Sequence, residues 1–451
     1  MNTKRIIRIV IITVVIYALY YVSLRLPIIT GYAAKNMCSC VFVSNRDAED
    51  VEKNDLNFSL IKYARNKIDY KNKKVTSRIL GLAKQTAVYN EGLGCTLLAN
   101  YSENEYKPPV APDVLPTLEL LDSVPWPSGD LVCDTIPEGV NIKELNKVVN
   151  WAFDKQNKTD SLKQTLSLLV IYKNQIIAEK YAPGIKKNTT LLGWSMTKSI
   201  MSTLVGILVQ KNKLDINKPV NIPEWKSDKR KNITLNNLLH MNSGLRWDED
   251  YFDNSDVTRM LYKRGNMADY AISVPADVKP DSVWQYSSGT SNIISGLIRQ
   301  VFDDYNEYIN FPREALFNKI GMRSVVIEPD ASGTYIGSSY SYATTRDWGR
   351  FGLLYLNNGI WEGERILPEE WLEYTLEPAK GSKGEYGAQF WLNKGKKMKD
   401  VPEDMLSCYG FKGQRIFIIP SKDLVVVRMG LSHDFLDFND LLKKIIDTLP
   451  A

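Results

Sequence analysis

Histidine is almost absent from this chain of 451 residues, which contains only His240 and His433. Two histidines are too few for a His-rich metal cluster or for several imidazole proton relays. We therefore expect that no metal and no cofactor is required, and that any general base is a residue of another type.

A concentrated charge of one sign is also missing. The formal net charge is only +5, from 57 basic and 52 acidic residues, and it is spread over the whole sequence. Nucleic-acid binding usually needs basic residues gathered on one face, so nucleic acid is excluded as a partner. With 44% hydrophobic and 24% charged residues, the composition is that of a globular protein long enough for two lobes.

Long apolar runs are scarce, and the one that stands out lies near the N-terminus. It extends from Ile9 to Leu24 after the basic residues Lys4, Arg5 and Arg8. Positive charge before an apolar run predicts a membrane anchor, with the catalytic body on the non-cytoplasmic (periplasmic or extracytoplasmic) side. The run is short for a full span. A cleaved signal ending near 31–33, which would give a secreted form, and a buried helix of a soluble protein remain as alternatives.

Cysteine is sparse and odd in number. The five cysteines are Cys38, Cys40, Cys95, Cys133 and Cys408, and no pair has the Cys-x-x-Cys spacing of redox or zinc sites. We expect structural cysteines, with room for one bridge and at least one thiol unpaired within the chain.

The chain divides into three parts: an anchor or signal over 1–35, an appended region with a Pro-rich connector over 36–135, and a main domain over 136–451. Apolar spacing predicts a helix over 54–68 and short strands over 75–98 in the appended region. In the main domain the pattern predicts helices and paired strands, namely a helix over 142–153, strands over 166–172, 175–181, 415–420 and 424–429, and a closing helix over 438–449.

The strongest local signal for chemistry is Ser195, followed three residues later by Lys198 at the start of a small-residue, apolar run that predicts a buried helix. Residues three apart lie on one helix face, so the amine can reach the hydroxyl. Such a pair activates serine without histidine. The pattern is weak alone, since Ser59 and Lys62 repeat it on a polar segment.

Two further segments add to this signal. Tyr286 and Ser288 lie in a small polar turn before an apolar helix, where a phenol can point into a cleft. Phe411, Gly413 and Gln414 open a predicted strand, where glycine allows backbone to approach a substrate.

In this order and separation, the three segments resemble the motifs of the class C β-lactamase family, which includes penicillin-recognising peptidases, carboxylesterases and aminohexanoate-dimer hydrolases. The resemblance covers roughly residue 140 to the C-terminus. It implies an α/β fold of β-lactamase/transpeptidase type, in which an antiparallel-type sheet is flanked by helices and faces a helical lobe across the active site.

The resemblance also implies residue roles. Ser195 would form an acyl-enzyme, and Lys198 and Tyr286 would share the proton transfers, with the base left open between them. The backbone amides of Ser195 and Gln414 would hold the oxyanion, and Ser288 would contact the lysine and the substrate. The substrate would be a small-molecule or short peptide-like ester or amide.

One departure concerns Phe411, which stands where the family usually has lysine or histidine. Lys412 follows it, but neighbouring side chains on a strand face opposite ways. We therefore expect poor recognition of a β-lactam carboxylate.

Two other functions are alternatives to this one. One is an anchored penicillin-binding or sensor-like module that is occupied or acylated without turnover. The other is an α/β-hydrolase that uses Ser195 with His433, which fits poorly because the second glycine of that family's nucleophile motif is missing.

Overall fold

The main domain is built on a six-stranded sheet. The computed structural model describes residues 3–153, 163–432 and 436–450. All neighbouring strands in the order β12-β13-β14-β15-β5-β6 are antiparallel. Their bounds are Thr165–Tyr172 (β5), Gln175–Tyr181 (β6), Trp391–Leu392 (β12), Leu406–Gly410 (β13), Gln414–Ile419 (β14) and Leu424–Gly430 (β15). The early hairpin thus joins the last strands of the chain.

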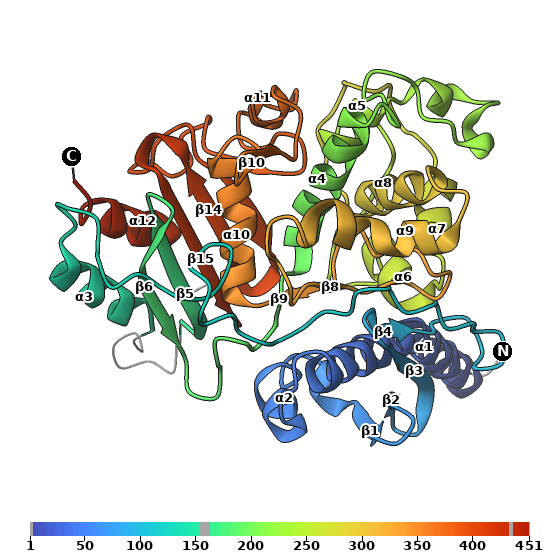
Figure 1. Cartoon of the computed structure of the whole chain (residues 1–451). Helices are drawn as coiled ribbons and strands as arrows, with labels where there is room; N and C mark the ends of the chain where they lie inside the picture. The colour runs from blue at the N-terminus through green and yellow to red at the C-terminus, as the bar shows by residue number, and fades with distance from the viewer. Residues whose placement is uncertain (1–2, 154–162, 433–435, 451) are drawn as a thin grey trace.

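Helices cover both faces of this sheet (Figure 1). On one face, α3 (Ile142–Phe153) and α12 (Phe438–Ile446) pack on Leu168 and Val170 of β5. On the other face, α10 (Thr345–Leu356) packs on β5, β14 and β15. A strand covered on both faces favours apolar residues at successive positions, which explains the apolar run over 168–172 in β5. The predicted antiparallel sheet flanked by helices is confirmed.

A helical lobe lies beside the sheet (Figure 1). Its elements are η2 (Trp194–Met196), α4 (Thr197–Gln210), η3 (Pro223–Trp225), η4 (Lys229–Asn232), α5 (Leu235–Leu239), α6 (Asp256–Lys263), α7 (Met267–Ser273), α8 (Ser288–Gln300), α9 (Tyr305–Pro312) and η5 (Arg313–Phe317). The buried helix predicted after Ser195 is α4, whose residues 197–208 are all buried.

Short elements complete the main domain. They are β7 (Leu191–Leu192), β8 (Val326–Ile327), β9 (Ser341–Ala343), β10 (Ile360–Trp361), β11 (Glu364–Arg365), α11 (Trp371–Leu376), η6 (Phe411–Gly413) and η7 (Pro420–Lys422). Strands β7, β9 and β8 form a three-stranded sheet that leads into the turn of Ser195.

The N-terminal region forms a separate layer below the main domain in Figure 1. Helix α1 (Thr3–Phe42) lies on a four-stranded antiparallel sheet and is followed by α2 (Ala48–Asn54) and η1 (Ile61–Tyr63). The strands are β1 (Arg65–Asp69), β2 (Lys74–Ile79), β3 (Leu82–Asn90) and β4 (Gly94–Leu97). Helix α1 runs through residue 35 without a break, and the strands expected over 75–98 are present.

The helix expected over 54–68 is wrong. Helix α2 ends at Asn54, Ser59 has a positive φ of 45°, and the segment from Arg65 pairs with β2 as an edge strand. A non-glycine residue with positive φ cannot continue a right-handed helix.

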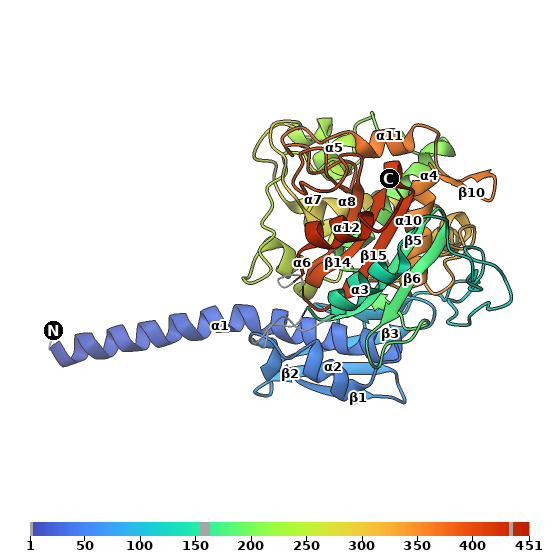
Figure 2. The same ribbon diagram turned by 90° about the vertical axis from the view of Figure 1, so that its left-hand side faces the viewer.

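The expected membrane anchor is also wrong. Figure 2 shows the first half of α1 projecting from the body. Among the described residues, however, no helix is both long enough and apolar enough to cross a membrane. The run from Ile9 to Leu24 contains three tyrosines and ends at Arg25. At 1.5 Å per residue it reaches about 24 Å, against about 30 Å for the hydrocarbon core.

Farther along, α1 is buried in the protein instead. Tyr32 is 8% exposed and Ala33 is fully buried, so the segment considered as a cleavage site lies inside a packed helix. The predicted membrane-anchored location is wrong together with the anchor.

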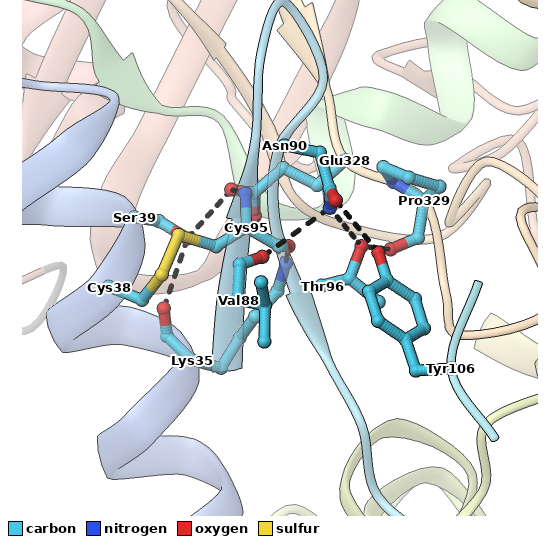
Figure 3. The surroundings of a disulfide bond; sticks show 10 residues. All are labelled: Lys35, Cys38, Ser39, Val88, Asn90, Cys95, Thr96, Tyr106, Glu328 and Pro329. Atoms are coloured by element: carbon cyan, nitrogen blue, oxygen red, sulfur yellow. Dashed lines mark hydrogen bonds and ion pairs between the residues drawn. A yellow bond between two sulfur atoms is a disulfide. The ribbon is translucent and has the colours of Figure 1, made fainter. Parts of the chain in front are cut away.

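A buried ion pair and a disulfide join α1 to the rest of the protein (Figure 3). Lys35 Nζ lies 2.5 Å from Glu328 Oε2, and both side chains are at most 1% exposed. Glu328 Oε1 also accepts hydrogen bonds from Ser39 Oγ at 2.7 Å and from the Cys95 amide at 2.6 Å. Burial lowers the pKa of Lys35 and raises the pKa of Glu328, while their mutual attraction opposes both shifts.

The disulfide joins Cys38 of α1 to Cys95 of β4, which fits the expectation of one bridge. The other three cysteines, Cys40, Cys133 and Cys408, are free.

Breaking the ion pair is expected to destabilise the protein. Glu328→Gln leaves the Lys35 ammonium buried without its counter-charge, so the free energy of unfolding should fall by about 3 to 5 kcal/mol. Urea titration followed by tryptophan fluorescence measures this change. The double variant Lys35→Met/Glu328→Gln should recover most of the loss because no charge remains buried. Equal losses in the single and double variants would show that charge burial is not the cause.

Candidate active site

Ser195 lies in a tight turn between β7 and α4. Its neighbour Trp194 has a φ of 50°, an uncommon value for a bulky residue and one that costs about 1 to 3 kcal/mol. The turn is held by a hydrogen bond from the Gly193 amide to the Ser341 carbonyl at 2.8 Å, and by stacking of the Trp194 ring on Tyr32. The fold therefore holds a strained backbone that leaves Ser195 half-exposed.

Lys198 follows in the first turn of α4 and is 1% exposed. Its Nζ donates to Ser195 Oγ at 3.1 Å, to Ser288 Oγ at 3.1 Å and to the Ser338 carbonyl at 3.0 Å. Burial lowers the pKa of Lys198 to about 8, although the nearby Glu249 carboxylate acts in the opposite direction. The structure thus brings Ser195, Lys198 and Ser288 into contact, although they belong to two motifs that are distant in the sequence.

Tyr286 precedes Ser287, the N-cap residue of α8, and its phenol lies next to the Ser195 side chain. Its ring stacks on Trp391, with centroids 5.5 Å apart, and meets Tyr386 edge to face. Burial and the negative charge of Glu249 raise the pKa of Tyr286, so the phenol stays protonated near neutral pH.

Glu249 was missed by the sequence analysis. It lies in the loop between α5 and α6 and accepts hydrogen bonds from Ser288 Oγ at 2.5 Å, from the Ser288 amide at 2.9 Å and from the Tyr251 hydroxyl at 2.9 Å. Its carboxylate therefore fixes the hydroxyl that accepts from Lys198. Several acidic residues crowd this loop, and no motif singles out Glu249.

Phe411 and Lys412 lie in the short turn η6 rather than on a strand, so the alternation expected for them does not apply. The Phe411 ring meets Trp194 edge to face and stacks on Tyr251, at centroid distances of 5.6 and 6.2 Å. Lys412 has a φ of 60°, and its Nζ donates to the Asp55 carbonyl at 3.2 Å. Its amine therefore contacts the N-terminal region.

The strand ends on either side of η6 lie against the turn of Ser195. A Cβ at Gly410 would come within 2.1 Å of the Gly193 carbonyl oxygen, so only glycine permits this approach. Gly413 has a φ of 81° and ends the turn. The Gln414 side chain exchanges two hydrogen bonds with the Gly430 backbone, at 2.5 and 2.8 Å. Its amide side chain is thus engaged away from the site, and the backbone of Gln414 is the part available beside Ser195.

His240 does not contribute to this arrangement. His240 is buried next to Asn236 and Tyr374, and burial lowers its pKa. His433 lies outside the described residues. Within residues 3–153, 163–432 and 436–450, no group of three or more histidine, cysteine, aspartate or glutamate side chains is placed to hold a metal ion.

Comparison with known proteins bears on this arrangement. The model of the family described as Beta-lactamase matches residues 156–434, more than half of the chain. The chain belongs to the beta-lactamase family. This result confirms the resemblance inferred from the three motifs and the expectation of a serine hydrolase.

Individual relatives are distant. The 6-aminohexanoate-dimer hydrolase of Paenarthrobacter ureafaciens is 24% identical over 293 residues, which cover 59% of this chain and 72% of that protein. A penicillin-binding protein homologue from Caulobacter crescentus has a TM-score of 0.54 at 13% identity, covering 70% of this chain and 98% of that one. A family VIII carboxylesterase has a TM-score of 0.54 at 15% identity, covering 70% and 97%. These structural likenesses confirm the fold.

The Glu249 carboxylate should set the pH at which Lys198 loses its proton. A fluorophosphonate labels an activated serine, and we expect activation of Ser195 to need the neutral amine of Lys198, so the labelling rate should rise with pH around 8. Glu249→Gln removes the negative charge that favours the ammonium, and the midpoint should move to lower pH. Labelling reactions that are quenched at set times, at fixed ionic strength, measure how the labelling rate depends on pH. Asp250→Asn, at an exposed neighbour, is the matched control and should leave the midpoint in place.

Proposed function

We propose that this protein hydrolyses esters or amides with an uncharged acyl group through an acyl-enzyme on Ser195. The observation that carries the proposal is the hydrogen bond between the buried Lys198 amine and the Ser195 hydroxyl. An amine whose pKa is about 8 is neutral in an appreciable fraction of molecules near neutral pH. It can then accept the serine proton as the hydroxyl attacks.

Lys198 is the proposed base, and Tyr286 passes a proton from Lys198 to the leaving group. A neutral lysine keeps two N–H bonds, which match the Ser288 hydroxyl and the Ser338 carbonyl, and it offers its lone pair to Ser195. Tyr286 is protonated at that pH because its pKa is raised, so it is suited to donate rather than to start the reaction.

The reaction then proceeds in two steps. Ser195 Oγ bonds to the carbonyl carbon, and its proton passes to Lys198. The oxyanion is stabilised by the backbone amides of Ser195 and Gln414. When the bond to the leaving group breaks, the proton reaches that group through Tyr286. Water then attacks the ester at Ser195 by the reverse proton path, releasing the acid and restoring the serine.

Ser288 and Glu249 serve as positioning residues. The Glu249 carboxylate accepts the Ser288 proton, so the serine oxygen stays oriented as an acceptor for Lys198. This chain of hydrogen bonds keeps the amine within reach of Ser195 in both protonation states.

Substitution of the proposed base should abolish most turnover while leaving the nucleophile in place. Lys198→Arg keeps the charge but cannot supply a neutral amine, and kcat for p-nitrophenyl butyrate should fall by at least about 100-fold. Ser195→Ala should remove both turnover and fluorophosphonate labelling. A near-native rate in Lys198→Arg would remove this residue from the mechanism.

Sustained turnover distinguishes this proposal from occupancy without release, the sensor-like alternative. Steady-state product well beyond one equivalent per Ser195 supports hydrolysis, whereas a single burst would support a trapped acyl-enzyme.

Phe411 should make this enzyme a poor β-lactamase. A substrate carboxylate near its ring lacks the charge-assisted hydrogen bonds worth about 1.5 to 3 kcal/mol. We expect kcat/KM for p-nitrophenyl butyrate to exceed that for a chromogenic cephalosporin. Phe411→Lys should raise cephalosporin hydrolysis about tenfold to a hundredfold, while Phe411→Leu, which also loses the ring, should not. Efficient cephalosporin hydrolysis by the wild type, unimproved by lysine, would contradict the assignment.

A further inference from the structure

A cavity of about 130 Å³ lies directly beside Ser195, at the junction of the main domain and the N-terminal region. Half of the residues that line it come from α1 and from the loop between α2 and β1. Ile28 and Ile29 of α1 and Leu60 and Ile61 of the segment between α2 and β1 form the wall from the N-terminal region, and Phe411 lines the cavity from the main domain. The N-terminal region is therefore part of the wall next to the nucleophile.

The wall is apolar and carries no net charge. Among the described residues that line it, Arg25 and Asp253 are the charged ones, and they form an ion pair with each other. The remaining lining is aliphatic, aromatic or serine. A charged group entering this cavity would lose its water without gaining an unpaired counter-charge, whereas an apolar group gains by leaving water.

The position of the cavity assigns it to one end of the substrate. Ser195 lines it, but Lys198 and Tyr286 do not. The leaving group must lie near the phenol that gives it a proton, so the cavity on the other side of Ser195 receives the acyl part. A cavity of about 150 Å³ holds one benzene molecule, so this cavity has room for roughly six carbon atoms.

Contacts across the junction keep the wall in place. Tyr32 of α1 stacks on Trp194, the residue before the nucleophile, with centroids 6.1 Å apart. The Lys35–Glu328 ion pair lies one turn farther along the same helix. The wall of the cavity is therefore fixed relative to Ser195.

We infer that the N-terminal region forms an acyl-chain pocket that selects esters or amides of linear, uncharged aliphatic acids of about six carbons. This inference rests on the proposed acyl-enzyme at Ser195. It gives a function to the segments over 25–32 and 58–61, which the catalytic motifs do not include.

The test measures kcat/KM for p-nitrophenyl esters of increasing acyl length and a charged analogue. Burial of each methylene improves kcat/KM by about fourfold at most, so hexanoate should exceed acetate at least tenfold, with no further gain at decanoate. The 6-aminohexanoyl ester, of similar length but charged, should be at least tenfold poorer than the hexanoyl ester. Equal rates for acetate and hexanoate, or for the charged and uncharged esters, would overturn the inference. Loss of activity on all esters would instead overturn the proposed function.

Two variants assign the effect to the N-terminal wall. Ile28→Trp fills the cavity and should reduce hexanoate hydrolysis at least tenfold while sparing acetate. Ile16→Trp, on the projecting and exposed part of the same helix, is the matched control and should change neither. Leu60→Asp, at a half-exposed position of the wall, should raise the ratio of 6-aminohexanoyl to hexanoyl hydrolysis at least fivefold. Ratios unchanged in both wall variants would show that the chain binds elsewhere.

Discussion

The amino group of Lys198 loses its hydrating water when the protein folds. Acceptors from three segments that lie far apart in the chain take the place of that water. The Ser195 hydroxyl, the Ser288 hydroxyl and the Ser338 carbonyl each accept one of its hydrogen bonds. An amine buried without these acceptors would be very costly. The same burial that requires partners also lowers the pKa of Lys198, so the constraint on folding and the reactivity of the site have one origin.

Glu249 partly offsets the effect of burial on the pKa of Lys198. Its carboxylate acts on Lys198 through Ser288 and favours the ammonium, while it raises the pKa of Tyr286. The two candidate proton carriers thus have pKa values pushed apart, one downward and one upward. Such separation is how a site of limited size keeps one group as base and another as acid.

The N-terminal region is integrated into the same structure rather than attached to its surface. Helix α1 reaches the main domain through the Lys35–Glu328 ion pair and through Tyr32, which stacks on Trp194 beside Ser195. The disulfide between Cys38 and Cys95 fixes the helix to its own sheet. A helix whose first half has the sequence pattern of a membrane segment is, over its second half, a buried element that borders the turn of Ser195.

Local patterns in the sequence determined much of this protein. Helix α3, the hairpin of β5 and β6, and the buried helix after Ser195 depend on residues close in sequence, as does the reach of Lys198 back to Ser195. Tertiary structure alone decided the rest. The helix expected over 54–68 gave way to an edge strand because β2 was available for pairing, and Phe411 entered a turn because β13 and β14 join there. Glu249 and the α1 wall approach Ser195 only through packing between distant segments, and no local spacing encodes contacts of that kind.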